Sequence, residues 1–231
     1  MQAVAPPTPK FDVLHLDECF VAVSKPPGLL VHRTREASDQ VFLLQELGAQ
    51  LGRFLYPAHR LDRATSGVIT FAFSGEDARL LQMSLNGGET RKEYLALVRG
   101  STPEEWEDDR PLSNKAGVKQ AARTSFRRLA EFSRSSLLRA RLFTGRRHQI
   151  RRHLAHKAHQ VIGDTSHGKG RINQFFRDNY GLPRLFLHAE RLEMPHPRTG
   201  DPLAIHVPLA TDLREFLERL PDCPRELIAT L

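Results

Sequence analysis

The sequence has only two cysteines, Cys19 and Cys223, which are far apart in the chain and lack metal-ligand spacing. Neither a disulfide framework nor a zinc ribbon is indicated, and a reducing compartment is expected. No apolar run reaches the roughly 18–20 residues that a membrane span needs, and the first ten residues lack the apolar core of a signal peptide. We therefore expect a cytoplasmic protein without a membrane partner.

Cofactor and metal motifs are also missing. The chain has neither a Walker P-loop nor a dinucleotide fingerprint, so we expect no cofactor. The histidines at 153, 156 and 159 are spaced by three and drift off a common helix face, and there is no HExxH pattern, so we expect no metal. Ser66 lies in ATSGV rather than in the GxSxG of hydrolases.

Acidic residues are scarce in one window. The formal net charge is +7, and the segment from Arg127 to Arg152 contains nine arginines but one acid, Glu131. Such a density of arginine attracts polyanions and suits phosphate contacts, which favours nucleic acid as the partner. A solvated basic face that only keeps the protein soluble is the alternative.

The hydrophobic pattern predicts an α+β fold. A chain of 231 residues is long enough for one sizeable domain. We expect residues 1–10, with three prolines, to be a disordered tail, and residues 11–231 to form one catalytic domain. Runs that alternate or are apolar predict strands at 11–15, 20–24, 68–73, 92–99, 119–129, 136–143, 185–187 and 203–207. The sheet is predicted to be mixed and largely antiparallel, with peripheral helices and loops.

Capping patterns locate the helices. Ser38 and Ser74 are predicted to cap helices that end near Gly48 or Gly52 and at Leu85, respectively. A third helix is expected from His148 to about His159, and a last one from Thr211 or Asp212 to Leu220. We expect residues 102–110 to be an exposed excursion and residues 163–181 to be a loop.

The nonapeptide HRLDRATSG, residues 59–67, contains the first candidate for chemistry. It places Asp62 between two permanent cations, Arg60 and Arg63, which favour the ionised carboxylate. The loop leads into a buried strand, a position at which catalytic residues tend to lie. Asp62 is therefore a candidate nucleophile, with an ordinary surface ion pair as the alternative.

The second candidate stretch is TGRRHQIRRH, residues 144–153. A helix beginning near Gly145 or Arg146 would put Arg147, Ile150 and Arg151 on one side. An arginine there could reach a carboxylate on a neighbouring loop. A basic helix face that touches only solvent is the alternative.

Five stretches together resemble a known family. They are VAVSKPPGLLVH (21–32), HRLDRATSG (59–67), RKEYLALVRG (91–100), TGRRHQIRRHLAH (144–156) and IGDTSHG (162–168). In this order they are similar to the RluA type of RNA pseudouridine synthases, over about residues 11–209. The resemblance implies a cofactor-free isomerase that breaks the glycosidic bond of a uridine in RNA and reattaches the base through carbon.

The resemblance also implies site residues. Asp62 matches the catalytic aspartate, and Tyr94 matches a tyrosine that packs against the target base and is a candidate for proton transfer. Arg151 matches the arginine that pairs with the aspartate, and Arg60 the arginine that helps to expel the uridine from the RNA helix. The match of Ile205, as an apolar contact to uracil, is loose. Arg146, Arg147 and His148 are expected to bind RNA.

Two departures bear on the substrate. His167 stands where most of the family has tyrosine, and residues 169–184 form a longer insertion than usual. With LPRLFLHA after it, this insertion is most similar to the tRNA-directed branch, which modifies a uridine at the base of the T stem. We expect no S4-like RNA-binding domain. We expect a monomer that acts on tRNA; a ribosomal RNA substrate, a non-catalytic RNA-binding module and a metal-dependent phosphate hydrolase are the alternatives.

Overall fold

The structure is a computed structural model that describes residues 11–33 and 39–231. The predicted tail and the predicted cap Ser38 lie outside the described residues. The strands are β1 (Val13–Leu16), β2 (Phe20–Lys25), β3 (Tyr56–Pro57), β4 (Ser66–Ala72), β5 (Arg91–Arg99), β6 (Glu105–Asp108), β7 (Leu112–Ser113), β8 (Lys119–Gln120), β9 (Thr124–Phe132), β10 (Ser135–Leu142), β11 (Leu187–Pro195) and β12 (Pro202–His206). The helices are α1 (Leu43–Leu51), α2 (Gly75–Asn86), α3 (Gln149–His156), α4 (Gly170–Tyr180), α5 (Thr211–Glu218) and α6 (Arg225–Ala229).

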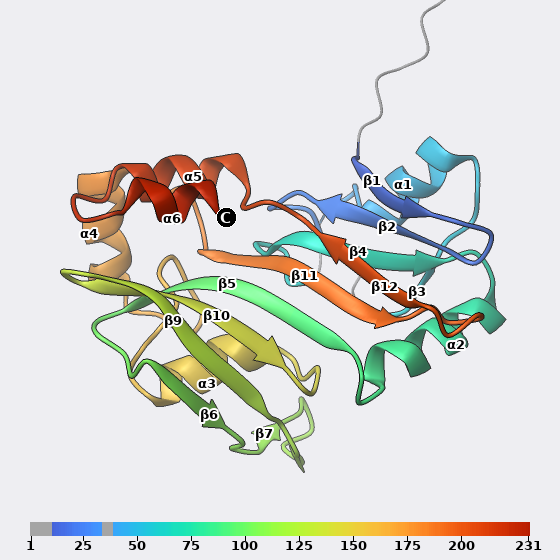
Figure 1. Ribbon diagram of the computed structural model, residues 1–231, viewed down its shortest axis with the longest axis horizontal. Helices are drawn as coiled ribbons and strands as arrows, with labels where there is room; N and C mark the ends of the chain where they lie inside the picture. Colours follow the sequence, from blue (N-terminus) through green and yellow to red (C-terminus); the bar gives the residue numbers. More distant parts are fainter. Residues whose placement is uncertain (1–10, 34–38) are drawn as a thin grey trace, which may run out of the picture.

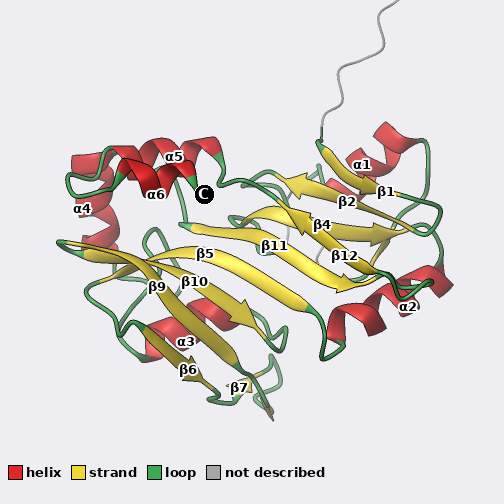
Figure 2. Cartoon of the chain, in the orientation of Figure 1, coloured by secondary structure: helices red, strands yellow, loops and turns green. Residues whose placement is uncertain are grey.

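One ten-stranded sheet extends through the fold, with helices around it (Figure 2). Its strand order is β1-β2-β4-β11-β5-β10-β9-β6, with β12 paired to β11 and β3 paired to β4. All of these pairs are antiparallel except β4 with β11. This architecture confirms the predicted α+β class and the mixed, largely antiparallel sheet.

The parallel pair β4–β11 joins the two halves of the sheet. Gly67 of β4 lies opposite Ala189 of β11 and has a positive φ of 110°. A Cβ atom at this position would lie 2.1 Å from the carbonyl oxygen of Ala189. Because only glycine tolerates both this approach and this φ, residue 67 fixes how the loop before β4 enters the sheet.

Helices pack on both faces of the half of the sheet that contains β5 and β10. Ala96, Leu138 and Ala140 pack with α3, whereas their neighbours Leu97 and Leu137 pack with α4, α5 and α6. Alternate residues of a strand point to opposite faces, so α3 lies on one face and the C-terminal helices on the other. Figure 1 shows α4, α5 and α6 gathered at one end, and α1 and α2 around the β1–β4 half.

Several predicted elements need correction. The expected loop at 163–181 contains α4, whose apolar residues at 172, 175, 176 and 180 follow a helical period that the surrounding polar residues obscured. The expected excursion at 102–110 contains β6, which pairs with β9 and stacks Trp106 on Phe126 at 4.8 Å. Leu187 begins the long strand β11 instead of ending a short one, and α6 follows the predicted last helix, α5.

Other predictions hold. Ser74 caps α2 by accepting a hydrogen bond from the backbone N–H of Asp77 at 3.0 Å. The predicted first hairpin is present as β1 and β2. Helix α1 ends at Gly52, which has a left-handed conformation.

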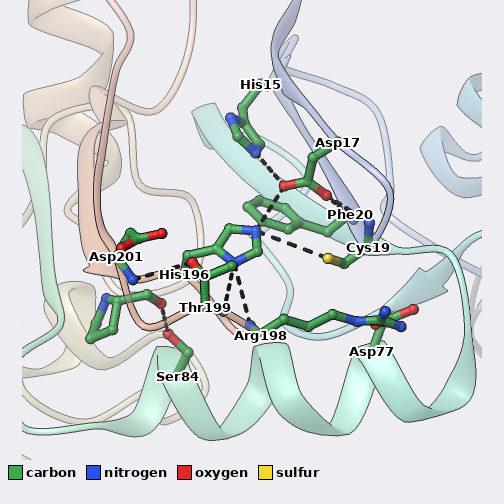
Figure 3. Close-up of polar contacts among 11 residues, drawn as sticks. His15, Asp17, Cys19, Phe20, Asp77, Ser84, His196, Arg198, Thr199 and Asp201 are labelled. Atoms are coloured by element: carbon green, nitrogen blue, oxygen red, sulfur yellow. Dashed lines mark hydrogen bonds and ion pairs between the residues drawn. The ribbon is translucent and has the colours of Figure 1, made fainter.

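Asp17 connects this hairpin to the β11–β12 turn (Figure 3). Its Oδ1 accepts hydrogen bonds from the backbone N–H groups of Cys19 and Phe20, at 2.7 and 2.9 Å. Its Oδ2 lies 2.6 Å from Nε2 of His15 and 2.9 Å from Nε2 of His196, which lies in the turn. The carboxylate therefore joins two segments that are 179 residues apart in sequence.

Candidate active site

Asp62 lies on the loop between β3 and β4, and its neighbour Arg63 anchors that loop. The carbonyl oxygen of Arg63 accepts hydrogen bonds from the backbone N–H of Gly28 at 2.8 Å and from Nζ of the fully buried Lys25 at 3.1 Å. Its guanidinium group donates to the carbonyl of Gly28 at 3.0 Å and pairs with Asp39 at 2.9 Å. Arg63, which the sequence offered only as a cation near Asp62, thus ties the Asp62 loop to the turn at residues 25–28.

Arg151 of α3 is the cation that contacts Asp62. Its Nη1 lies 2.8 Å from Oδ2 of Asp62, although 89 residues separate the two in sequence. The rest of its guanidinium group pairs with both oxygens of the buried Asp164, at 2.7 and 2.8 Å. Burial opposes the charge on Arg151, but the hydrogen bonds that it donates to the two carboxylates outweigh this effect and raise its pKa. Arg151 is therefore a rigid, permanently charged partner for Asp62.

Asp62 opens into a cavity of about 350 Å³. Seven residues that the sequence assigned to the site line it: Arg60, Asp62, Tyr94, Arg146, Arg147, His148 and Arg151. Asp62 is the only carboxylate among the described residues of this lining. The cavity thus combines one acidic side chain with several cations, as a site for a polyanionic substrate requires.

Tyr94 lines the cavity from β5, the strand next to β11 in the sheet. Burial raises the pKa of its hydroxyl, and the charge of Asp62 raises it further. The phenol therefore stays protonated near neutral pH, where it can donate a hydrogen bond and offer its ring as a stacking surface.

Ile205 does not join the site. It is buried in β12, opposite Leu192, in the apolar cluster of the β1–β4 half. The apolar wall of the cavity includes instead Leu142 of β10, Ile150 of α3 and Leu187 of β11. Ile205 is therefore not among the residues that line this cavity, because strand β12 turns its side chain into the core.

The basic residues before α3 lie in a turn and not on the helix as expected. The helix begins at Gln149, whose side-chain oxygen accepts hydrogen bonds from the hydroxyl of Thr144 at 2.8 Å and the backbone N–H of Arg146 at 3.0 Å. His148 has a left-handed conformation with φ of 54°, which is unusual for a residue other than glycine. The turn directs Arg146, Arg147 and His148 toward the cavity instead of along one helix face.

The nine arginines of the basic window do not form one surface. Arg139 and Arg141 share a face of β10 with Leu137, away from α3, and Arg127 lies opposite Arg139 in β9. Arg146, Arg147 and Arg151 line the cavity, and Arg152 lines a neighbouring groove of about 780 Å³ beside the β7–β8 hairpin. Arg127, Arg139 and Arg141 therefore lie on the face of the sheet away from α3 and are not among the arginines that line the cavity.

Sequence reasoning missed several residues of the site. Gln82 and Asn86 line the cavity from one face of α2, and Lys92 lines it from β5. Asp164 binds the Nε and Nη2 atoms of Arg151, on the side away from Asp62. The only sequence signal for Asp164 was its position in the IGDTSHG stretch. The α2 residues carry no local pattern that distinguishes them from other exposed polar residues of a helix.

One group of possible metal ligands comes together among the described residues. His15, Asp17 and His196 offer ligand atoms within 4.8 Å of one another (Figure 3). However, Nδ1 of His196 accepts hydrogen bonds from the backbone N–H groups of Arg198 and Thr199, at 3.3 and 3.2 Å. The proton of a neutral His196 therefore lies on Nε2, which donates to Asp17 and has no lone pair for a metal. Hydrogen bonds suffice to explain this cluster.

Comparisons with known proteins agree with this geometry. Residues 19–156 match the family model described as RNA pseudouridylate synthase. A protein named tRNA pseudouridine synthase C from Vibrio vulnificus is 37% identical over 90% of this chain and 94% of its own length. The protein of that name from Pasteurella multocida is 39% identical over 84% of this chain and 89% of its own length.

Solved structures share the fold. Human RNA pseudouridylate synthase domain containing 4 superposes with a TM-score of 0.76 and 24% identity, over 90% of this chain and 92% of that chain. Human RNA pseudouridylate synthase domain containing 1 gives a TM-score of 0.70 with 19% identity, over 89% and 86% of the two chains. Together with the sequence matches, these findings mean that the chain belongs to the RNA pseudouridylate synthase family, enzymes that isomerise uridine to pseudouridine in RNA.

Proposed function

We propose that this enzyme acts on a uridine of tRNA, with Asp62 as its reacting carboxylate. The observation that carries the role of Asp62 is its position as the cavity's only carboxylate among the described residues, with Arg151 bound to its Oδ2 at 2.8 Å. The tRNA substrate is supported by the names of the relatives, which are 35–39% identical to this chain. The T-stem uridine remains the target we expect.

The reaction exchanges one bond of the base for another. The bond from N1 of uracil to C1′ breaks, the base turns, C5 bonds to C1′, and the proton of C5 is lost while N1 gains one. Asp62 is placed to attack or to move a proton at the sugar or the base. Arg151 keeps its carboxylate charged and oriented, because a guanidinium group held by Asp164 cannot turn away.

The target uridine must leave its stack before Asp62 can reach it. Arg60 is exposed at the cavity and precedes Asp62 by two residues, so it is suited to occupy the space that the base vacates. The ring of Tyr94 would then stack on the uracil inside the cavity. Arg146, Arg147 and His148 would hold the adjoining phosphates.

We further propose that residues 11–231 act as one catalytic domain, as a monomer, in the cytoplasm and without metal or cofactor. Support for one domain comes from the single ten-stranded sheet to which both halves contribute. None of the helices in residues 11–33 and 39–231 has the length and apolarity to cross a membrane. Activity that survives a chelator at full rate would support the metal-free reaction.

Asp62→Asn tests the central role. A tRNA transcript labelled with tritium at C5 of uridine releases tritium only when C5 forms its new bond, so the variant should release none while it still binds the transcript. Release at the wild-type rate would contradict the role of Asp62. To test the substrate, pseudouridine is mapped in total RNA from cells with and without the gene. Loss of one tRNA position is expected, and loss of a ribosomal position would favour the ribosomal alternative.

A further inference from the structure

His148 and His167 form a pair at the edge of the active site. Nδ1 of His148 lies 3.0 Å from Nε2 of His167, and their rings meet edge to face with centroids 5.2 Å apart. On its other side, Nε2 of His148 lies 3.7 Å from Oδ1 of Asp62. His148 therefore stands between His167 and the carboxylate oxygen that Arg151 leaves free.

The position of His167 is set by the same residue that holds Arg151. The backbone N–H of His167 donates to Oδ1 of Asp164 at 2.9 Å, and the N–H of Ser166 donates to the same oxygen at 2.8 Å. Asp164 thus supports Asp62 by two routes, through Arg151 and through the turn that carries His167. His148 has a left-handed backbone with φ of 54°, a conformation that is unfavourable for residues other than glycine. The surrounding contacts must therefore stabilise His148 in this position.

Both imidazoles are neutral near pH 7. Burial lowers the pKa of His148 to about 4; the charge of Asp62 opposes this shift, while the charges of Arg151 and Arg147 and the neighbouring His167 add to it. Burial also lowers the pKa of His167. One proton must therefore lie between Nδ1 of His148 and Nε2 of His167, and either ring could carry it.

The carboxylate of Asp62 decides between these two arrangements. If His148 donated from Nδ1, its Nε2 would turn a lone pair toward the negative oxygen of Asp62. If His167 donates instead, Nε2 of His148 carries the proton and turns an N–H toward that oxygen. Because the second arrangement replaces a repulsion with an attraction, it is the stable one.

We propose that His167 is a positioning residue of this enzyme: by donating its Nε2–H to His148, it fixes the tautomer in which His148 presents an N–H to Asp62. The two oxygens of Asp62 would then face two donors, Arg151 at Oδ2 and His148 at Oδ1. The separation of 3.7 Å would shorten when the substrate fills the cavity. This inference rests on the proposed role of Asp62.

Nitrogen-15 NMR of the imidazoles tests the tautomer without RNA or activity. With ¹⁵N-histidine in the full chain, and His148→Gln to assign the signal, Nε2 of His148 should carry the proton and Nδ1 should not. His167→Phe should shift His148 toward the other tautomer. A proton on Nδ1 of His148 in the wild-type protein would overturn the proposal, whether or not the variant folds.

Single-turnover kinetics test the consequence for the reaction. His167→Phe should lower the rate constant about tenfold, the size expected for the loss of one hydrogen bond, with RNA affinity within about twofold of wild type. His167→Tyr adds a hydroxyl donor to the ring of the Phe variant and should recover most of the rate. As a control, His156→Phe, at an exposed position of α3, should match wild type. Equal rates for the Phe and Tyr variants would refute the proposal. Failure of the proposed function would appear separately, as an active Asp62→Asn.

Discussion

Arg151 joins Asp62 to Asp164 with a single guanidinium group. Nη1 contacts Asp62 at 2.8 Å, while Nε and Nη2 contact the two oxygens of Asp164 at 2.7 and 2.8 Å. Asp164 is fully buried as a side chain, whereas Asp62 remains 22% exposed toward the cavity. The buried carboxylate of Asp164 therefore holds Arg151, and Arg151 in turn orients the carboxylate of Asp62, which can contact a substrate.

Arg151→Lys should separate charge from geometry. A lysine keeps the positive charge but cannot bind Asp164 through two parallel hydrogen bonds and reach Asp62 at the same time. We expect the single-turnover rate to fall about 100-fold, since the cost of losing a positioned charged partner is about 3 kcal/mol. RNA binding should change by less than about threefold, as measured by filter binding. A wild-type rate in the lysine variant would mean that charge alone suffices.

Tyr94→Phe should leave the alkaline part of the pH profile unchanged in shape. Because burial and Asp62 raise the pKa of Tyr94 above its ordinary value, about 10, the wild-type hydroxyl stays protonated between about pH 8 and pH 10. The rate of the variant should fall about tenfold through loss of one hydrogen-bond donor, and its profile should run parallel to that of wild type. An alkaline limb that only the wild-type enzyme shows would identify Tyr94 as an ionised base.

Arg147→Ala should weaken RNA binding through the phosphates. Arg147 is exposed and lines the cavity, so its loss should reduce the slope of log affinity against log salt by about one. Arg127→Ala is the matched control, because Arg127 is also exposed but lies on the face of the sheet opposite α3. Equal effects of the two substitutions would mean that arginines on both faces of the sheet contribute to RNA binding.

Asp17→Asn should destabilise the protein near neutral pH. Burial would raise the pKa of Asp17, but hydrogen bonds from His15, from the N–H groups of Phe20 and Cys19 and from His196 outweigh it and lower the pKa. A lowered folded-state pKa contributes stability that is present above about pH 4, the value in the unfolded chain, and is lost as the pH falls below it. We expect Tm to drop by about 3–6 °C at pH 7, because the amide would turn N–H groups toward the histidines.

The same comparison at low pH tests this sign. The difference in Tm between wild type and Asp17→Asn, followed by circular dichroism, should shrink below about pH 4. Asp12→Asn, at an exposed position just before β1, should have the stability of wild type at both pH values. A constant difference across this range would show that the charge of Asp17 is not responsible.

Local patterns were sufficient for much of the fold. The hairpin of β1 and β2, the buried strand β4 and the Ser74 cap of α2 all depend on residues within a few positions of one another. Helix α4 and strand β6 escaped prediction because their few apolar residues, such as Phe176 and Trp106, pack against distant elements: Phe176 against α5, and Trp106 against β9.

By itself, the sequence determined the family, the α+β class and the candidate carboxylate, because motifs and hydrophobic periods are carried by neighbouring residues. The resemblance already paired Arg151 with Asp62, and the tertiary structure added that Asp164 holds Arg151 in place. Only the tertiary structure decided that Ile205 belongs to the core and that Arg127 and Arg139 lie on the face of the sheet away from α3. It also brought His167 to His148. Such pairings depend on how β4 pairs with β11 and on where α3 begins. The contacts involved join residues that are far apart in sequence; Ser66 and His188, for example, are separated by 122 positions.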